Sequence, residues 1–590
     1  VAFESCRDRT VGTGIFLIHY RLDHNIALGL EAGVDLQLYD FPHDVWQKAI
    51  AHLIESGSMK MSVLDTACRR VLRMKFALGL FENPYTDEKR ADKILRCPEH
   101  LTTAEKIAEK SIVLLKNDGL LPIRKDLRSV AVIGPAADTV SYGDYTETRG
   151  RKGGVSVLDG IRAAVSPETE VLYERGCNFL GQALHPFDPS MLRDENGESG
   201  LTGHYYNGPV PQGEPVQVRT DRTVNFNWIF ALPHPALDAN CFSVVWTGSV
   251  VMPRTMDGCI GLSTQDSMRL YVDDKLLIDG WGKDKSADQA LDFHFEAGRT
   301  YKIRIEFVND RRGARVIFGY SAGRENFPAA VEAARKADVA ILCMGDNEET
   351  SGENFDRTDL NLPGRQLELV QAVYATGTPV VLVLQSGRPV TANWENDHLP
   401  AILEAWFPGE QGGTAIAKTL FGDAAPGGRL PITFPRSVGQ IPCHYSRRPG
   451  GGKRYVEMDW LPLYPFGYGL TYTTFAYRDM ALSRSVIDPQ DTVTVSVTVT
   501  NTGKYTGDAV PQLYVRDMFS SVVKPERQLA AFRRLTLAPG ESRRVELTVG
   551  PKQLRTLGPD YVWRVEPGKF ELQLGDNAEN ILLRADLTVE

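Results

Sequence analysis

The sequence predicts a multidomain protein that combines α/β domains with all-β domains, and three observations support this. First, 590 residues are too many for one hydrophobic core. Second, residues 100–195, and again residues from about 327 onward, alternate short apolar strands with helices, which is typical of a parallel sheet covered by helices. Third, residues 198–322 and 476–590 alternate apolar and polar side chains between turn residues, which is typical of β-sandwiches.

The first part of the chain, residues 24–95, is expected to be mostly helical. Val34, Leu36 and Leu38 alternate after Ala32-Gly33 and predict one short strand. Residues 59–81 predict a helix that ends at Asn83-Pro84. Its apolar residues share one stripe at helical spacing: Met61, Leu64, Cys68, Val71 and Leu72.

The α/β part begins with a predicted helix over residues 103–117 and a buried strand over 129–135. After the all-β interruption it resumes with a helix and strand at 329–345. Further helices are predicted at 363–376 and 412–422, and further strands at 378–387 and 401–409.

One loop of this part is unusually acidic. Residues 345–357, GDNEETSGENFDR, carry five carboxylates in thirteen residues and directly follow an apolar strand. Ligands of parallel sheets bind at the carboxyl ends of strands, where the loops at 134–136 and 385–387 also begin. A solvated surface loop is the plain interpretation; a catalytic carboxylate is the alternative.

Composition excludes several classes of function. A net charge of −9 without a basic block argues against nucleic acid as a partner. No apolar run approaches the ~20 residues that cross a bilayer. Eight cysteines show no CxxC spacing, and the histidines, including His43, His204, His234 and His294, form no metal-like cluster. The residues from Val1 onward are not a signal peptide, and the chain is expected to be a fragment or a processed product. Localisation therefore stays open between cytoplasm and export.

The two all-β regions contain residues with two interpretations. Aromatic core packing is expected for Trp228, Trp246 and Trp281, with sugar stacking as the alternative. The residues Asp266, Asp273 and Asp274 suggest a ligand or calcium loop, although a hairpin turn better suits the adjacent pair. In the last region Val493, Val495, Val497 and Val499 share one face, which predicts an immunoglobulin-like sandwich without the Cys…Trp…Cys pattern of true immunoglobulin domains.

Five motifs in one order resemble glycoside hydrolase family 3, which includes β-glucosidases and β-xylosidases. They are EKSIVLLKNDGLLPI, ENFDRTDLNLPGRQLELV, LQSGRPV, AWFPGEQGGTAIAKTLFGDAAPGGRLPITFP and YPFGYGLTYTTF. The insertion, with GLTGHYYNG and LYVDDKLLIDGW, is similar to the protective-antigen-type carbohydrate-binding module of some members.

The resemblance implies the following domains: a C-terminal remnant of a (β/α)₈ barrel with a linker (1–95), a split α/β sandwich (96–197 and 323–450), the protective-antigen-type β-sandwich (198–322), a linker (451–475) and a fibronectin type III-like domain (476–590). Such a barrel needs roughly 200 residues, so an N-terminally truncated barrel is expected. Asp35 then belongs to the core or rim of the last barrel strand.

The resemblance also implies a catalytic residue. Family members of this kind are retaining glycosidases, whose acid/base glutamate stands shortly before a Phe-Asp-Arg-Thr-Asp segment; Glu353 occupies that place, although Asn354 stands where glycine is common. Crowded carboxylates disfavour full ionisation, which suits a proton donor. Glu349 is the second candidate, Glu348 is expected to shape the pocket, and Asp356 is expected to fix the loop with Arg357.

The nucleophile has no matching residue. In the family it is an Asp in a Ser-Asp-Trp-like or Ser-Asp-Tyr-like segment of the barrel, which corresponds here to the stretch from Phe3 to Asp8. Ser5 is followed by Cys6, and the carboxylates of Glu4 and Asp8 are out of register. The nucleophile is therefore expected to be absent or displaced.

The expected function is that of a retaining β-glycosidase acting on a β-glucoside or a short oligosaccharide without a cofactor or metal. Glucose and xylose are not distinguished, since the residues that read this difference are expected in the barrel. The alternative is a non-catalytic carbohydrate-binding protein built on hydrolase domains. Neither nucleic acid nor a membrane is expected as a partner, and a homo-oligomer stays open.

Overall fold

The structure, a computed structural model, describes residues 14–36, 43–143, 146, 153–180, 184–228, 232–238, 241–264, 266–281, 287–309, 315–322, 326–347, 350–353, 355–450 and 454–590. The chain divides into two compact units, Val1–Cys97 and Pro98–Glu590.

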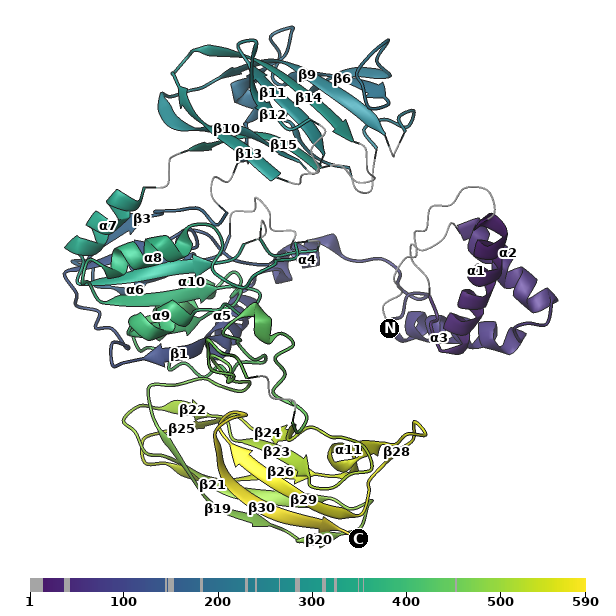
Figure 1. Cartoon of the computed structure of the whole chain (residues 1–590), viewed down its shortest axis with the longest axis vertical. Helices are drawn as coiled ribbons and strands as arrows, with labels where there is room; N and C mark the ends of the chain where they lie inside the picture. The colour runs from purple at the N-terminus through teal and green to yellow at the C-terminus, as the bar shows by residue number, and fades with distance from the viewer. Residues whose placement is uncertain are drawn as a thin grey trace. The chain divides into compact units, whose positions relative to one another are not determined.

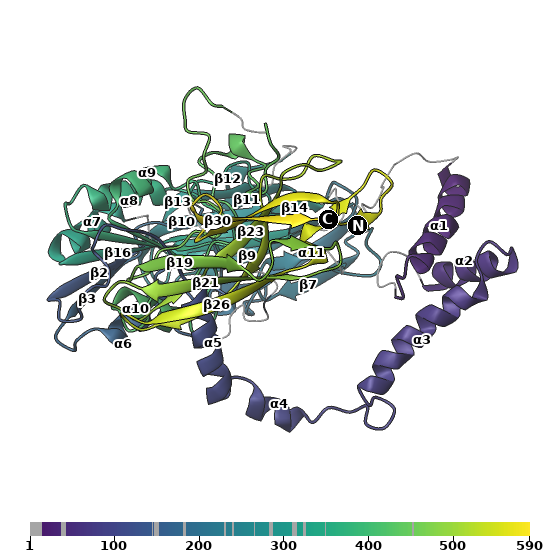
Figure 2. The same cartoon turned by 90° about the horizontal axis from the view of Figure 1, so that it is seen from below.

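The first unit is helical in its described residues. It contains α1 (Gly14–Glu31), α2 (His43–Glu55), α3 (Met61–Ala77) and α4 (Glu88–Ile94). Helix α1 packs against α2 and α3 (Figure 2). A small core joins these three helices: Ile26, Leu30, Ala49, Leu53, Met59 and Ala67. The helix predicted over residues 59–81 is confirmed as α3.

The strand predicted at residues 34–38 is wrong over its described part. Residues 34–36 form no strand, the side chains of Val34 and Leu36 are exposed, and residues 37–38 lie outside the described residues. A strand needs a partner for its backbone groups, and the described residues of this unit are helical around it. Asp35 instead forms an ion pair with Arg70 at 3.0 Å.

The second unit is built around a six-stranded sheet in the order β1-β18-β17-β16-β2-β3. Its strands are β1 (Val113–Asn117), β2 (Ser129–Ile133), β3 (Glu170–Glu174), β16 (Val339–Gly345), β17 (Val380–Gln385) and β18 (Ala401–Glu404). All neighbouring pairs are parallel except β1 with β18. The predicted parallel sheet is therefore confirmed, with one antiparallel edge strand.

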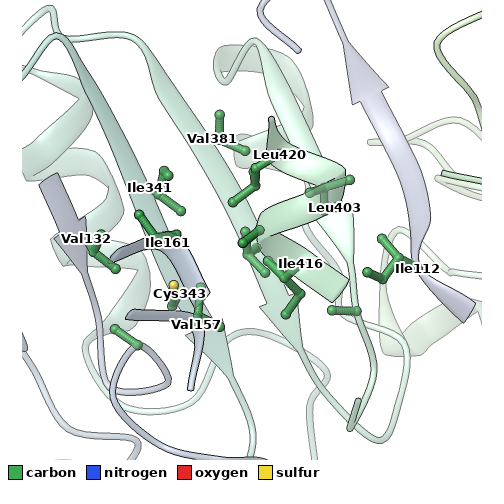
Figure 3. Packing of buried hydrophobic residues seen from close by; sticks show 14 of the residues in the cluster. Ile112, Val132, Val157, Ile161, Ile341, Cys343, Val381, Leu403, Ile416 and Leu420 are labelled. Carbon is green, nitrogen blue, oxygen red and sulfur yellow. The ribbon is translucent and has the colours of Figure 1, made fainter. Parts of the chain in front are cut away.

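Helices cover both faces of this sheet. They are α5 (Pro98–Ser111), α6 (Val157–Ala164), α7 (Phe327–Lys336), α8 (Gln366–Tyr374), α9 (Asn393–His398) and α10 (Gly412–Leu420). Along β16, Ile341 and Cys343 pack toward α6 and α10 (Figure 3), whereas Leu342 and Met344 pack toward α7 and α8. Because both faces are buried, the strand reads as an unbroken apolar run.

The helix predicted over residues 103–117 is only partly right, because its last residues form a strand in the structure. Helix α5 stops at Ser111, and Val113–Asn117 forms β1, which pairs with β18. Buried Leu114 and Leu115 fit either structure locally, but pairing with a strand nearly 300 residues later satisfies the backbone of β1 at the sheet edge.

An all-β insertion separates β3 from α7. Its strands are β4 (His185–Pro186), β5 (Leu192–Arg193), β6 (Leu201–Asn207), β7 (Gln217–Asp221), β8 (Asn225–Asn227), β9 (Phe242–Val251), β10 (Met256–Thr264), β11 (Ser267–Val272), β12 (Lys275–Asp279), β13 (Ala287–Phe295), β14 (Thr300–Asn309) and β15 (Arg315–Ala322). They form two antiparallel sheets that share one core (Figure 1). The predicted β-sandwich character is confirmed.

The structure places five of the insertion's residues that had two interpretations. Trp228 and Trp246 are buried in the shared core, whereas Trp281 is half-buried with the Arg269 guanidinium 4.7 Å from its ring centroid. Asp273 and Asp274 take φ angles of 49° and 62° between β11 and β12, as a tight hairpin turn requires.

The last region is a second β-sandwich. One sheet joins β19 (Phe475–Leu482), β21 (Val493–Asn501) and β26 (Ser542–Val549); the other joins β20 (Val486–Ile487), β30 (Ile581–Val589), β29 (Gly568–Gly575), β23 (Gln512–Asp517) and β24 (Gln528–Phe532). The alternating valines of β21 are all fully buried in the core between them, as predicted. This region also has two short strand pairs, β22 (Gly507–Ala509) with β25 (Leu535–Leu537) and β27 (Thr556–Leu557) with β28 (Trp563–Arg564), and helix α11 (Pro551–Leu554). Two 3₁₀ helices, η1 (Pro189–Met191) and η2 (Val438–Gln440), lie earlier in the chain.

Candidate active site

The carboxyl ends of β2, β16 and β17 are joined by buried amide side chains. The Gln366 amide donates to the Gly345 carbonyl at 2.9 Å and accepts from the Gly345 N–H at 2.8 Å. The Gln385 amide donates to the carbonyl of Ala136 at 3.0 Å. The backbone N–H of Asp346 donates to the Gln385 carbonyl at 2.8 Å. The acidic loop therefore starts from a fixed point on the sheet.

Asp346 is the centre of an ion-pair network at this edge. Its side chain is buried, and Oδ1 accepts from the Thr350 hydroxyl at 2.9 Å and from Arg357 Nη1 at 3.2 Å. Arg388 Nε, from the loop after β17, lies 3.5 Å from Oδ2. Arg388 also donates to the Thr350 carbonyl at 3.0 Å. One carboxylate thus ties two loops together.

The partner expected for Arg357 was Asp356, and this is wrong. Arg357 bonds instead to Asp346, to Asp359 at 3.2 Å and to the Asn361 carbonyl at 2.7 Å. Asp356 is exposed. A planar guanidinium with several donors is best satisfied by acceptors at different points, which here span the base of the loop.

Glu353 lies beyond this anchored base. The turn that precedes it is closed by the Ser351 N–H donating to the Asn347 carbonyl at 2.9 Å, and the Glu353 residue itself is exposed. Glu348, Glu349 and Asn354 lie outside the described residues. A carboxyl on an exposed segment with a rigid base can meet a substrate that approaches the carboxyl ends of the strands.

A second buried carboxyl, Glu404, ends β18. It is fully buried, and its Oε1 accepts the backbone N–H of Trp406 at 2.8 Å. Trp406 has a φ of 59°, which is strained for a side chain of this size. Burial, together with the negative charge of Asp346, raises the pKa of the Glu404 carboxyl well above its usual range. The Glu404 carboxyl therefore holds a strained turn next to the Asp346 network, in surroundings that favour its protonated form.

We expect Glu404→Gln to change how the free energy of unfolding depends on pH. The unfolded chain ionises this carboxyl above about pH 4.3, whereas in the folded chain the raised pKa keeps the proton to a higher pH, so stability falls as pH rises from there. Glutamine does not titrate. The variant should thus gain stability relative to the parent between pH 4 and pH 7, measured by urea denaturation. The control Glu368→Gln, which replaces an exposed carboxylate of α8, should not show this gain. If the free energy of unfolding changed with pH in the same way for both variants, the raised pKa of Glu404 would be contradicted.

Sequence reasoning found Glu353 through its motif but missed Asp346, Arg388 and Glu404. Two signals were present. Asp346 is the first residue after a buried strand, and Glu404 is an acidic residue inside the apolar run AILEAWF. A charge in a buried strand is costly unless it is neutralised or paired, so such a position indicates a structural or functional role.

Other features of the described residues bear on the class of function. Within them, no cluster of three or more His, Cys, Asp or Glu is placed to hold a metal ion, and no described helix is long and apolar enough to span a bilayer. A cavity of about 750 Å³ lies beside the acidic loop, lined by Thr350, Phe355, Asp356, Arg357 and residues at the start of α8.

Comparison with known proteins identifies the family. Residues 112–472, more than half of the chain, match the glycosyl hydrolase family 3 C-terminal domain. The chain belongs to glycosyl hydrolase family 3. Residues 509–578 of this family 3 chain match a fibronectin type III-like domain, so the resemblance seen in the motifs is confirmed.

Two relatives and one solved structure illustrate the similarity. The family 3 chain is 32% identical to a β-glucosidase of Rhizobium radiobacter, over 98% of this chain and 72% of the relative. It is 31% identical to a β-xylosidase of Formosa agariphila, over 95% of this chain and 61% of the relative. The crystal structure of a Kluyveromyces marxianus β-glucosidase in complex with glucose matches with a TM-score of 0.73 and 27% identity, over 96% of this chain and 72% of that one.

Proposed function

We propose that this chain acts in a retaining β-glycosidase that removes terminal β-linked glucose, or a similar sugar, from oligosaccharides or β-glucosides, with Glu353 as the general acid/base. The observation that carries the proposal is the anchored acidic loop. Glu353 is exposed just beyond the anchored base of this loop, at the carboxyl edge of the sheet, and its motif resembles that of the family's acid/base. The names of the relatives support the substrate class.

The chemistry assigned to Glu353 has two steps. In the first, its protonated carboxyl gives a proton to the glycosidic oxygen while a second carboxylate attacks the anomeric carbon and the C–O bond breaks. In the second, the Glu353 carboxylate takes a proton from water, which attacks the glycosyl ester and releases the sugar with its original anomeric configuration. The two carboxyls must lie ~5 Å apart for this outcome.

The nucleophile is proposed to come from a barrel domain. Glu4 and Asp8, the carboxylates nearest to the family's position, are out of register and lie outside the described residues. Helices α1 to α3 are proposed to be the last helices of such a barrel. In the same proposal, the insertion is a carbohydrate-binding module that leans over the active site and limits the length of the substrate.

The test is hydrolysis of nitrophenyl β-glucoside and nitrophenyl β-xyloside by two proteins. One is this chain; the other is this chain joined to the part of the Rhizobium radiobacter β-glucosidase that it does not cover, which we propose contains the barrel. We expect hydrolysis only from the joined protein, with retention of the anomeric configuration. Proton NMR of the released sugar measures that configuration. Hydrolysis by the chain alone would contradict the proposed source of the nucleophile. Sugar binding without hydrolysis in both would favour a carbohydrate-binding protein.

A further inference from the structure

A second cavity lies far along the chain from the acidic loop, where residues 440–466 meet the C-terminal sandwich. Its volume is about 510 Å³, within the ~300–1,000 Å³ of ligand sites in proteins. Aromatic rings, prolines and charged side chains line it together, among them Tyr445, Arg447, Arg448, Tyr455, Trp460 and Glu579. None of these residues takes part in the chemistry assigned to Glu353.

Arg447 fixes one wall of this cavity. Its Nε donates to Glu526 at 3.2 Å and its Nη1 to Glu579 at 3.0 Å. Its guanidinium carbon lies 4.5 Å from the ring centroid of Trp460. Because two carboxylates hold the arginine and the arginine covers the indole, the Trp460 ring is held in place before any ligand arrives.

The neighbouring rings are held as firmly. Tyr445 stacks on Phe466, with centroids 4.1 Å apart and planes 16° apart, and its hydroxyl accepts the Leu529 N–H at 3.2 Å. The hydroxyl of Tyr455 donates to the Gly439 carbonyl at 2.9 Å. A rigid aromatic wall costs little ordering entropy when a ligand binds.

Some groups of the lining remain available to a ligand. The side chain of Trp460 is 39% exposed, and both His444 and Arg448 are exposed. A partly exposed indole beside hydrogen-bond donors suits a pyranose ring, which has an apolar C–H face and hydroxyls around its edge. An anionic ligand fits less well, since the charge of Arg447 is already balanced by Glu526 and Glu579.

We propose that this cavity binds a neutral β-linked di- or trisaccharide, with one pyranose ring against Trp460 and its hydroxyls hydrogen-bonded to Arg448 and His444. The site is separate from the Glu353 loop and would hold a glycan while another part of it is processed. The proposal rests on the proposed function only in the choice of sugar.

The test is binding of cellotriose and xylotriose to this chain alone with Glu353→Gln, a form in which we expect no turnover to interfere. Isothermal titration calorimetry and saturation-transfer NMR measure how tightly the parent and its variants Trp460→Ala and Arg448→Ala bind each trisaccharide. The matched control is Trp563→Ala, because Trp563 is also exposed and has an arginine, Arg555, 4.4 Å from its ring centroid, but lines no described cavity. We expect at least tenfold weaker binding with Trp460→Ala, weaker binding with Arg448→Ala and unchanged binding with Trp563→Ala.

Two results would overturn the proposal: neither trisaccharide binds the Glu353→Gln chain, or Trp460→Ala binds as tightly as its parent. Nitrophenyl β-glucoside hydrolysis, measured with Glu353 present in the barrel-joined protein, should not change with Trp460→Ala. Binding that depends on Trp460 without any hydrolysis would support this site while contradicting the proposed function. Hydrolysis that depends on Glu353, without trisaccharide binding that depends on Trp460, would support the proposed function and contradict this site.

Discussion

Replacing Glu353 with glutamine is expected to slow the hydrolysis of cellobiose by about 10²- to 10⁴-fold, the usual contribution of a general acid. Glutamine keeps the shape of the side chain but has no proton to give to the departing oxygen. With 2,4-dinitrophenyl β-glucoside the loss in the first step should be far smaller, because dinitrophenolate leaves without being protonated. The measurement is kcat/KM over a series of aryl β-glucosides, in the form of the protein that hydrolyses them.

The control for this prediction is Asp356→Asn, three residues further along the same exposed loop. It removes one negative charge from the same segment, so a purely electrostatic role of the loop would affect both variants alike. Azide should restore turnover of the dinitrophenyl substrate by Glu353→Ala, since this small anion fits the space left by the carboxylate and needs no base. It attacks the glycosyl ester in the second step in place of water, so the product is a β-glucosyl azide. An equal loss for every leaving group would contradict the assignment of Glu353 as the acid.

The second large effect is expected from Asp346→Ala. Removing this carboxylate leaves Arg357 and Arg388 as largely buried cations without their shared partner, since their side chains are only 16% and 21% exposed. Loss of one partner from a buried ion pair costs about 3–5 kcal/mol of stability. We expect that loss in urea denaturation of the α/β domain, and faster hydrogen exchange over residues 350–361.

Two further variants separate charge from position. Asp346→Asn keeps the shape and the contact with Thr350, and should lose less stability than Asp346→Ala. Asp359→Ala removes the half-exposed partner of Arg357 and should cost less than about 1 kcal/mol. If Asp346 positions the loop, Asp346→Ala should show the same dependence on the leaving group as Glu353→Gln. Normal hydrolysis by a destabilised Asp346→Ala would limit Asp346 to a structural role.

The elements that could be predicted from the sequence are those whose burial is uniform or strictly alternating. The strands β16 and β17 are fully buried apolar runs, and β21 places every second residue in the core. Strand β1 was missed because its five residues continue a helical pattern and become a strand only through pairing with β18. Local sequence carries no information about so distant a partner.

The residues of the candidate site also differ in how far the sequence reveals them. Glu353 lies in a motif and could be found by resemblance. The Asp346 network could not, because its two arginines come 11 and 42 positions later, from separate loops that only the fold brings together. The raised pKa of the Glu404 carboxyl depends on complete burial, which a sequence of this composition does not reveal. Long-range charge pairing and burial are properties of the assembled sheet.

The insertion between β3 and α7 has a consequence for the order in which the chain folds on the ribosome. Strand β16 lies between β2 and β17, yet it is made roughly 200 residues after β2, which at about 5–20 residues per second is a delay of about 10–40 seconds. During that time β2 has an open edge on one side while the insertion is synthesised, and the insertion leaves the ribosome before β16 does. The inserted sandwich therefore has time to complete its own core before the host sheet can close around it.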